Sequence, residues 1–298
     1  MEGTDVVFWN NDYNIVLICN LAIIIATFTS LRWCTGMISH INPSKELLKK
    51  DNPAFGISLS AAFFAISIIL MGAVYGKPIY AMEESVIALA LCGVMGLVLL
   101  AISRLIFDKI ALPNISIRDE IVKGNISAAI VDAGNVIASA IIIRTMMVWN
   151  DLTTKDSILP ILMGFLISQA LLTVTTYFRT QKFTRKLGKT YQEHFTEGNT
   201  SAALRFAGRK IGTAFAITAA SNVLFFESFS IQTSLMYWGV ASVGMIIALS
   251  VLSYIANKVI LYHVDTDSEV IRQHNVAIGV VQCLIYISLG LLLSELLA

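Results

Sequence analysis

The chain has 298 residues, of which 56% are hydrophobic and only 14% are charged, and its mean hydropathy is +0.73. Soluble domains carry roughly 25% charged residues, so this composition argues against a soluble enzyme. The apolar residues also form long runs, such as 57–74, 86–102 and 236–251. Runs of this length can cross a hydrocarbon core of about 30 Å, and in lipid they are expected to be helical because their backbone groups must be paired internally.

Eight membrane helices are predicted along the chain, and they follow one another in pairs. The expected ranges are 13–31 and 54–75, 86–106 and 127–148, 157–178 and 200–224, and 233–255 and 276–297. A polar segment joins the two helices of each pair. The predicted fold class is therefore all-α, a polytopic membrane protein of four tandem two-helix repeats, divided into a first half (1–150) and a second half (151–298).

The repeat is visible where each polar segment meets the second helix of its pair. The four copies align on Asn52, Asn125, Asn199 and Asn275, which are separated by 73, 74 and 76 residues. An acidic residue stands six positions before each asparagine: Glu46, Asp119, Glu193 and Glu269. Agreement at several offsets in every copy indicates a true internal repeat rather than chance similarity.

The recurring acids and asparagines are interpreted as helix caps rather than as ion ligands. Ser116, Thr190 and Thr266 stand three residues before the acid, which is the spacing of a capping box at the start of a short helix. Gly124 and Gly198 are placed to end that helix in a left-handed conformation. The asparagine that follows is a favourable N-cap for the membrane helix.

The second helix of each pair carries small residues at shared offsets from the asparagine. Four positions after it stand Gly56, Ala129, Ala203 and Gly279, and eight positions after it stand Ser60, Ala133, Ala207 and Cys283. These offsets fall on one face of a helix, and small residues allow helix backbones to approach closely in lipid. The four second helices are therefore predicted to form the packed inner set.

Most lysines and arginines lie in the segments within the pairs, whereas the opposite side offers only Lys77 and Lys155 outside the helices. The positive-inside rule then predicts cytoplasmic intra-pair segments, with both termini outside. Trp9, Trp149 and Trp238 fall at predicted outer ends, as expected for an interfacial aromatic belt.

Two of the junctions carry a family resemblance. The stretches IRDEIVKGNISAAIVDAGNVIASAIII (117–143) and TEGNTSAALRFAGRKIGTAFAITAAS (196–221) resemble domain of unknown function 350, the YjfL-like bacterial inner-membrane proteins. The first and fourth copies depart from the pattern, since Asn52 lacks the preceding glycine and His274 takes its place before Asn275. The resemblance covers the whole chain as a duplicated form and implies a bacterial inner membrane, but it implies no reaction.

Polar residues at membrane depth are the candidate functional site, because they are costly there and usually face protein or water. Two of them, Asp132 and Gln282, share an offset of seven from the asparagine, and two others share an offset of ten. A structural ion pair of Asp132 with Arg205 or Arg209 and a role in conduction both remain open. The complete candidate set is Asp132, Asn135, Arg205, Arg209, Lys210 and Gln282.

Two functional hypotheses follow. The first is a channel or transporter for an ion or small solute, along an axis between parallel repeats. The alternative is a non-transporting scaffold that recruits anionic lipid or a cytoplasmic partner through the basic segment 179–195. The chain lacks the GxSxG, HExxH and phosphate-binding glycine patterns, so no enzyme activity and no cofactor or metal are expected. The expected partners are the lipid bilayer and not nucleic acid, and homo-oligomer formation stays open.

Overall fold

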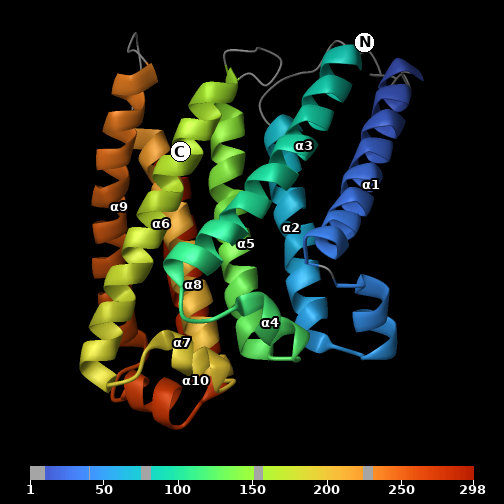
Figure 1. Ribbon diagram of the computed structural model, residues 1–298. Helices are drawn as coiled ribbons and strands as arrows, with labels where there is room; N and C mark the ends of the chain where they lie inside the picture. The colour runs from blue at the N-terminus through green and yellow to red at the C-terminus, as the bar shows by residue number, and fades with distance from the viewer. Residues whose placement is uncertain (1–10, 40, 75–81, 151–156, 224–230) are drawn as a thin grey trace, which may run out of the picture.

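The computed structural model describes residues 11–39, 41–74, 82–150, 157–223 and 231–298, and within these ranges every regular element is helical (Figure 1). Trp9, Lys77 and Lys155, which support part of the predicted topology, lie outside the described residues. Figure 1 shows long helices standing side by side, with short helices gathered at one end of the bundle.

The described residues form eight long helices that follow the predicted pairs. They are α1 (Asn11–Ser39), α2 (Pro53–Val74), α3 (Met82–Ile106), α5 (Ile126–Trp149), α6 (Ile158–Leu187), α8 (Thr200–Val223), α9 (Ile231–Ile260) and α10 (Val276–Leu296).

Seven of these helices are long and apolar enough to cross a membrane, and α8 is the one that is not. Its charges explain the difference, since Arg205, Arg209 and Lys210 all lie in the first half of a helix of 24 residues. Three helices also run farther than predicted: α1 ends at Ser39, α6 at Leu187 and α9 at Ile260. The extension of α6 is rich in Lys, Arg and Gln, which are good helix formers, so this helix continues beyond its apolar segment.

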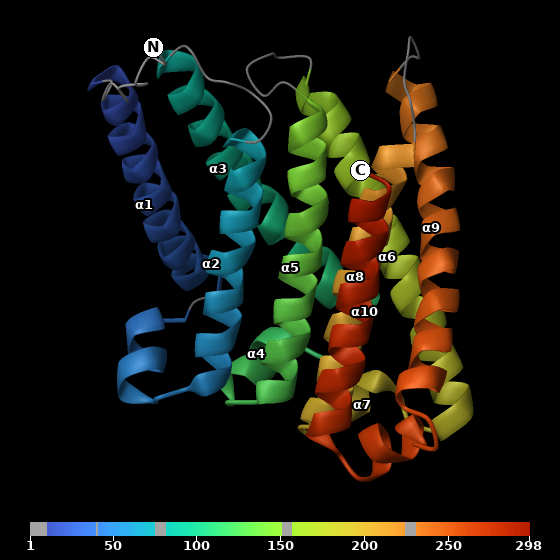
Figure 2. The same ribbon diagram turned by 180° about the vertical axis from the view of Figure 1, so that it is seen from behind.

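The second helices of the four pairs pack in a row, α2, α5, α8 and α10 (Figure 2). Small residues bring neighbours in this row into close contact, as predicted from the sequence. A Cβ added at Gly134 of α5 would lie 2.6 Å from the Cα of Ala207 of α8, and one at Gly279 of α10 would lie 2.9 Å from the Cα of Ser201. Such spacing leaves room only for hydrogen at these glycines.

The four inner helices form an open row, whereas the sequence predicts only that they pack together as an inner set. Figure 2 shows α5 between α2 and α10, which are the two end helices of the row. In the apolar segment of α5 78% of the residues are buried, whereas in that of α10 only 28% are. The inner helices therefore do not enclose a central axis. This arrangement does not provide the predicted pathway along an axis between the repeats.

The short helices lie together at one end of the bundle (Figure 1). They are η1 (Lys45–Lys49), α4 (Ile117–Val122), α7 (Tyr191–Thr196) and η4 (Ser268–Arg272), and a further short segment, η2 (Phe107–Ala111), continues α3. Thr190 and Glu193 form a complete capping box at α7, and the Ser116 side chain accepts from the Asp119 amide at α4. At η4, however, the Asp265 side chain accepts the amide hydrogen bonds of Asp267 and Ser268, and not Thr266 as predicted.

The junction asparagines cap the membrane helices and also connect neighbouring repeats. Each side-chain oxygen accepts from the amide three residues later, at 2.9–3.4 Å. The side-chain nitrogen of the first three donates to a carbonyl of the following repeat: Asn52 to Ile121 at 2.9 Å, Asn125 to Phe195 at 2.8 Å and Asn199 to Val270 at 3.1 Å. Asn275 has no following repeat and donates to Glu269 at 2.8 Å.

The residue before each asparagine has a positive φ in all four copies. Gly124 and Gly198 have φ values of 89° and 79°, and Asp51 and His274 have φ values of 48° and 54°. The left-handed turn is therefore kept even where glycine is missing, and Asp is one of the residues that tolerate it better than most. This conformation explains why the outer copies keep the same backbone while departing from the glycine-asparagine pattern.

Candidate functional site

The six candidate polar residues separate into two clusters rather than one site. Asp132 and Asn135 lie on α5 in the first half. Arg205, Arg209 and Lys210 lie on α8, and Gln282 lies on α10, all in the second half.

Asp132 is held in an ion pair within the first half. Its carboxylate accepts from Arg104 of α3 at 2.8 and 3.1 Å and from the Ser58 hydroxyl of α2 at 2.5 Å. The Asp132 side chain is 7% exposed and the Arg104 side chain 28%. The predicted alternative, a pair with Arg205 or Arg209, is therefore wrong, since the partner comes from the preceding helix of the same repeat.

Asn135 belongs to a separate buried network that joins α3, α5 and α6. Its side-chain nitrogen donates to Ser103 at 3.5 Å, and the Ser103 and Ser139 hydroxyls are 2.5 Å apart. Gln169 of α6 donates to the same Ser139 hydroxyl at 3.3 Å. Each of these side chains is at least 96% buried, so the network holds three helices together at membrane depth and has no access to solvent.

The second half replaces the first-half ion pair with a neutral pair of amides. Gln282 stands at the offset of Asp132, and its side-chain nitrogen donates to the Asn257 oxygen of α9 at 2.9 Å. Arg205 stands six residues after its asparagine, which is the offset of Ser58 in the first half. The second half therefore has an amide at the position of the Asp132 carboxylate and a guanidinium at the position of the Ser58 hydroxyl.

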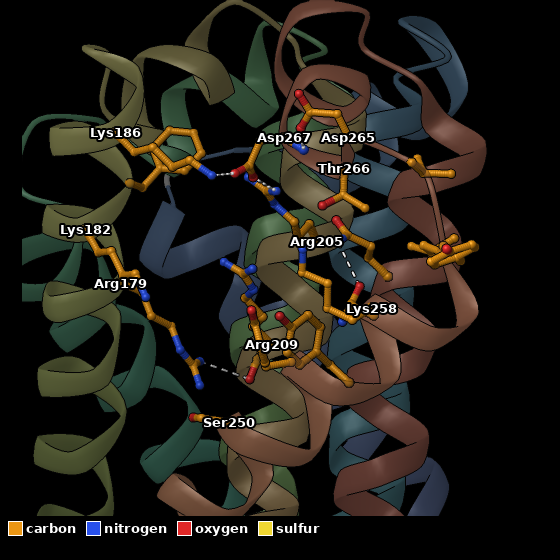
Figure 3. A pocket seen from close by; sticks show the side chains of 18 of the residues that line it. Arg179, Lys182, Lys186, Arg205, Arg209, Ser250, Lys258, Asp265, Thr266 and Asp267 are labelled. Carbon is orange, nitrogen blue, oxygen red and sulfur yellow. Dashed lines mark hydrogen bonds and ion pairs between the residues drawn. The ribbon is translucent and has the colours of Figure 1, made fainter.

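This exchange leaves an open basic cavity of about 950 Å³ in the second half, between α6, α8, α9, α10 and the loop before η4 (Figure 3). Two carboxylates, Asp265 and Asp267, contribute to its lining. Six basic side chains line it as well: Arg179, Lys182, Lys186, Arg205, Arg209 and Lys258. The cavity therefore carries an excess of positive charge and is suited to bind an anion.

Arg205 is the most deeply buried cation of the cavity, with only 1% of its side chain exposed. Its Nη1 donates to Asp267 Oδ1 at 2.7 Å. Its Nε and Nη2 have no hydrogen-bond partner among the described residues, and neither has Oε1 of Gln282. Buried donors without a partner are costly, so these atoms mark a place where a ligand would be stabilised.

Arg179 and Arg209 extend the basic lining away from Asp267. Arg179 Nη1 donates to the Arg209 carbonyl at 3.2 Å (Figure 3). It also donates to the Thr213 hydroxyl at 2.9 Å. Arg209 Nη1 donates to the Tyr191 hydroxyl at 3.0 Å, and its guanidinium lies 5.0 Å from the ring centre of Tyr286. These contacts fix both guanidinium groups without neutralising them.

Lys210 continues the same line of cations along α8. It is 4% exposed, and its ammonium lies 3.9 Å from the ring centre of Phe107, an arrangement typical of a cation–π contact. A small cavity of about 10 Å³ lies between Lys210, Arg179, Arg209 and Tyr191. The cationic groups of α8 and α6 thus form one continuous basic region.

Asp267 is the carboxylate that partly balances this region. Its two oxygens pair with Lys186 Nζ at 2.5 Å and with Arg205 Nη1 at 2.7 Å. Burial by itself would raise the pKa of the Asp267 carboxyl, but the hydrogen bonds and charges of Lys186 and Arg205 lower it below its usual value. Asp267 is therefore ionised at neutral pH and occupies part of the basic cavity.

The predicted candidate set leaves out several residues of the two clusters, among them Arg104, Arg179, Asn257 and Asp267. Arg179 is predicted only as part of the basic segment 179–195. Arg179, Lys182 and Lys186 are three and four residues apart, and this helical spacing could have placed them on one face of α6. The predicted docking segment 179–195 therefore turns part of its charge toward the cavity.

No group of three His, Cys, Asp or Glu side chains placed to hold a metal ion is found among the described residues. The site's chemistry is that of guanidinium, ammonium and amide groups, which recognise oxygen-rich anions by charge and hydrogen bonding.

The chain was compared with known protein families, curated proteins and solved structures. The family model described as Domain of Unknown Function (DUF350) matches twice, at residues 8–147 and 151–297, and the two matches correspond to the two halves of the helix bundle. No curated protein and no solved structure matches the chain. The chain therefore belongs to the domain of unknown function 350 family, in a form that contains the domain twice.

Proposed function

We propose that the protein crosses the membrane with eight helices, including α8, and that its second half binds and passes a small anionic solute. The placement of α8 beside α5 and α10 supports its inclusion, because its charged side chains can face the protein rather than lipid. In this proposal residues 1–150 and 151–298 act as two membrane units with both termini outside, in a bacterial inner membrane.

The basic cavity is the observation that carries the proposal. Six Lys and Arg side chains surround a space of about 950 Å³ and face only two carboxylates. Ionisable groups are expensive within a membrane and are usually kept there for a ligand or a conduction pathway. An excess of positive charge in a water-accessible cavity concentrates anions and excludes cations.

A direction for the solute follows from the positions of the cations on α8. Lys210 lies about 7.5 Å farther along the helix than Arg205, because each residue advances the helix by 1.5 Å. Arg209 lies between these two levels, and the Arg179 guanidinium reaches the Thr213 hydroxyl, farther along α8. Both arginines border the small cavity next to Lys210. A solute that enters beside Arg205 would therefore meet further cations as it moves deeper, as multi-site conduction requires.

Anion flux through the purified protein tests the proposal. Proteoliposomes that contain the wild-type chain should take up labelled phosphate or sulfate, while potassium uptake stays at the level of empty liposomes. Arg209→Gln should lower the anion flux about tenfold or more, because it removes one desolvated charge worth over 1.4 kcal/mol to the bound anion.

Arg185→Gln is the matched control, since Arg185 lies on the same stretch of α6 but is exposed and does not line the cavity. This variant should transport as the wild type does. A wild-type protein that reconstitutes in folded form but moves none of a panel of small anions would contradict a transport role.

The alternative is a scaffold that binds an anion without moving it. The exposed position of Lys186 at the cavity edge favours this reading, because its ammonium could reach a lipid headgroup or an acidic partner. Anion binding by the purified protein together with the absence of flux would favour the scaffold over the transporter.

A further inference from the structure

The carboxylate of Asp267 lies inside the basic cavity as an anion supplied by the chain itself. It comes from the segment that links α9 to η4 and bridges Lys186 of α6 and Arg205 of α8 (Figure 3). The bridge joins three elements that are distant in sequence, with separations of 81 residues to Lys186 and 62 to Arg205. The cavity is thus partly filled by a group that resembles the ligand expected there.

A carboxylate does not use all the donors that the site offers. Both Asp267 oxygens are engaged, one by each cation, while Nε and Nη2 of Arg205 stay without partners among the described residues. A phosphate group carries more acceptor oxygens and more negative charge than a carboxylate, and guanidinium groups bind phosphate through paired hydrogen bonds. A phosphate group could therefore satisfy donors that Asp267 leaves unpaired.

The first half supports the same interpretation by comparison. There the Asp132 carboxylate is fixed on a membrane helix and binds Arg104 and Ser58. In the second half the carboxylate comes instead from the end of a connecting segment in which residues 262–265 are exposed. A carboxylate on such a segment can leave its partners at a smaller cost than one on a packed helix.

We propose that the Asp267 carboxylate occupies the position in which a phosphate group binds, and that a phosphate-bearing ligand binds by displacing this carboxylate from Arg205 and Lys186. This proposal rests on the proposed anion-binding function. The ligand class is inorganic phosphate or a phosphomonoester, either free in water or as a lipid headgroup. Displacement releases the segment 261–267, so ligand binding and the mobility of this segment are coupled.

The direct test compares two neutralising substitutions in the full chain, purified in detergent, by calorimetric titration with inorganic phosphate. Asp267→Asn removes the competing anion and should raise the phosphate affinity about tenfold or more, since the binding-competent state is no longer a minor population. Glu197→Gln removes the same charge at the same end of the bundle, but Glu197 pairs with Lys189 and does not line the cavity. It should change the affinity less than about threefold, because an exposed charge is screened by solvent.

Three outcomes are distinct. A selective gain in Asp267→Asn supports displacement. Equal affinities in the two variants, or weaker binding by Asp267→Asn, overturn displacement and leave anion binding intact. No phosphate binding by the wild type or either variant overturns the anion-binding function itself together with this inference.

A second measurement needs no substitution and remains decisive if Asp267→Asn fails to fold. Amide hydrogen exchange of residues 261–268 is followed in phosphatidylcholine nanodiscs, with added inorganic phosphate in one arm and with phosphatidic acid in the bilayer in the other. The Asp267 and Ser268 amides are bonded to Asp265 in the unliganded state. Displacement predicts faster exchange in the arm that contains the true ligand, which also identifies its source. Bound phosphate with unchanged or slower exchange would overturn the proposal.

Discussion

Gly134→Val is expected to separate the two halves of the bundle and to lower the stability of the protein more than any substitution on its lipid-facing surface. Gly134 of α5 meets Ala207 of α8, and an added Cβ would lie 2.6 Å from both the Cα and the Cβ of that alanine. Backbone cannot move aside as a flexible side chain can, so overpacking should cost about 3 kcal/mol, the upper end of the usual range. Thermal unfolding of the purified protein would report this as a large fall in Tm.

The control for this substitution is Gly244→Val on α9. Gly244 is exposed, and no atom lies within 4 Å of an added Cβ. A change within about 0.5 kcal/mol is expected there, since valine is also a slightly better helix former than glycine. Equal destabilisation by both substitutions would show that the close α5–α8 contact does not hold the halves together.

The second large effect is expected at the ion pair of the first half. Asp132→Gln should destabilise the protein by about 3 kcal/mol, because it leaves the Arg104 guanidinium partly buried without its charged partner. Adding Arg104→Asn should restore most of the loss. The double variant replaces the ion pair with two amides, the type of pair that Gln282 of α10 and Asn257 of α9 form in the second half at 2.9 Å.

Chemical or thermal unfolding of the single and double variants measures the coupling between the two sites. A double variant within about 1 kcal/mol of the wild type is expected, since replacing both partners of a buried ion pair with a neutral pair is often nearly neutral. A double variant that is as unstable as the sum of the two single variants would contradict the coupling of Asp132 with Arg104.

The general architecture could be predicted because it is repeated and periodic. The asparagine-centred junctions have the same offsets in four copies, and the physical roles of caps, turns and small residues depend mainly on local sequence. The resemblance to domain of unknown function 350 also followed from these junctions, and the family match covers both halves. The arrangement of the four inner helices in a row could not be read from such offsets, because a row and a ring use the same small-residue faces.

The partners of the polar residues were harder to predict, since they depend on tertiary contacts. Asp132 was considered with cations of the third repeat, whereas its partner Arg104 lies on the helix that precedes it in its own repeat. Arg104 stands at the end of an apolar run, where a cation is ordinarily explained as an anchor at the membrane surface. Asp267 was missed for a similar reason: it lies in a connecting segment, and its contact with Arg205 spans 62 residues.

The two halves of the chain therefore differ mainly in where their buried charged side chains lie and in how these side chains are paired. In the first half Arg104, Asp132 and Ser58 satisfy one another. In the second half Arg205 stands at the Ser58 position and amides replace the ion pair, which leaves a basic cavity with unpaired buried donors. The first half thus satisfies its buried charges internally, whereas the second has the features that we propose as an anion site.

Phosphate binding by Arg205→Ser tests this account most directly, because the substitution restores the first-half residue at the second-half position. Calorimetric titration of the purified chain should show binding by the wild type and by the control Arg185→Ser. Arg205→Ser should bind at least about tenfold more weakly, since charge-assisted hydrogen bonds contribute about 1.5–3 kcal/mol each. A folded Arg205→Ser variant that binds phosphate as tightly as the wild type would contradict the assignment of the basic cavity as the anion site.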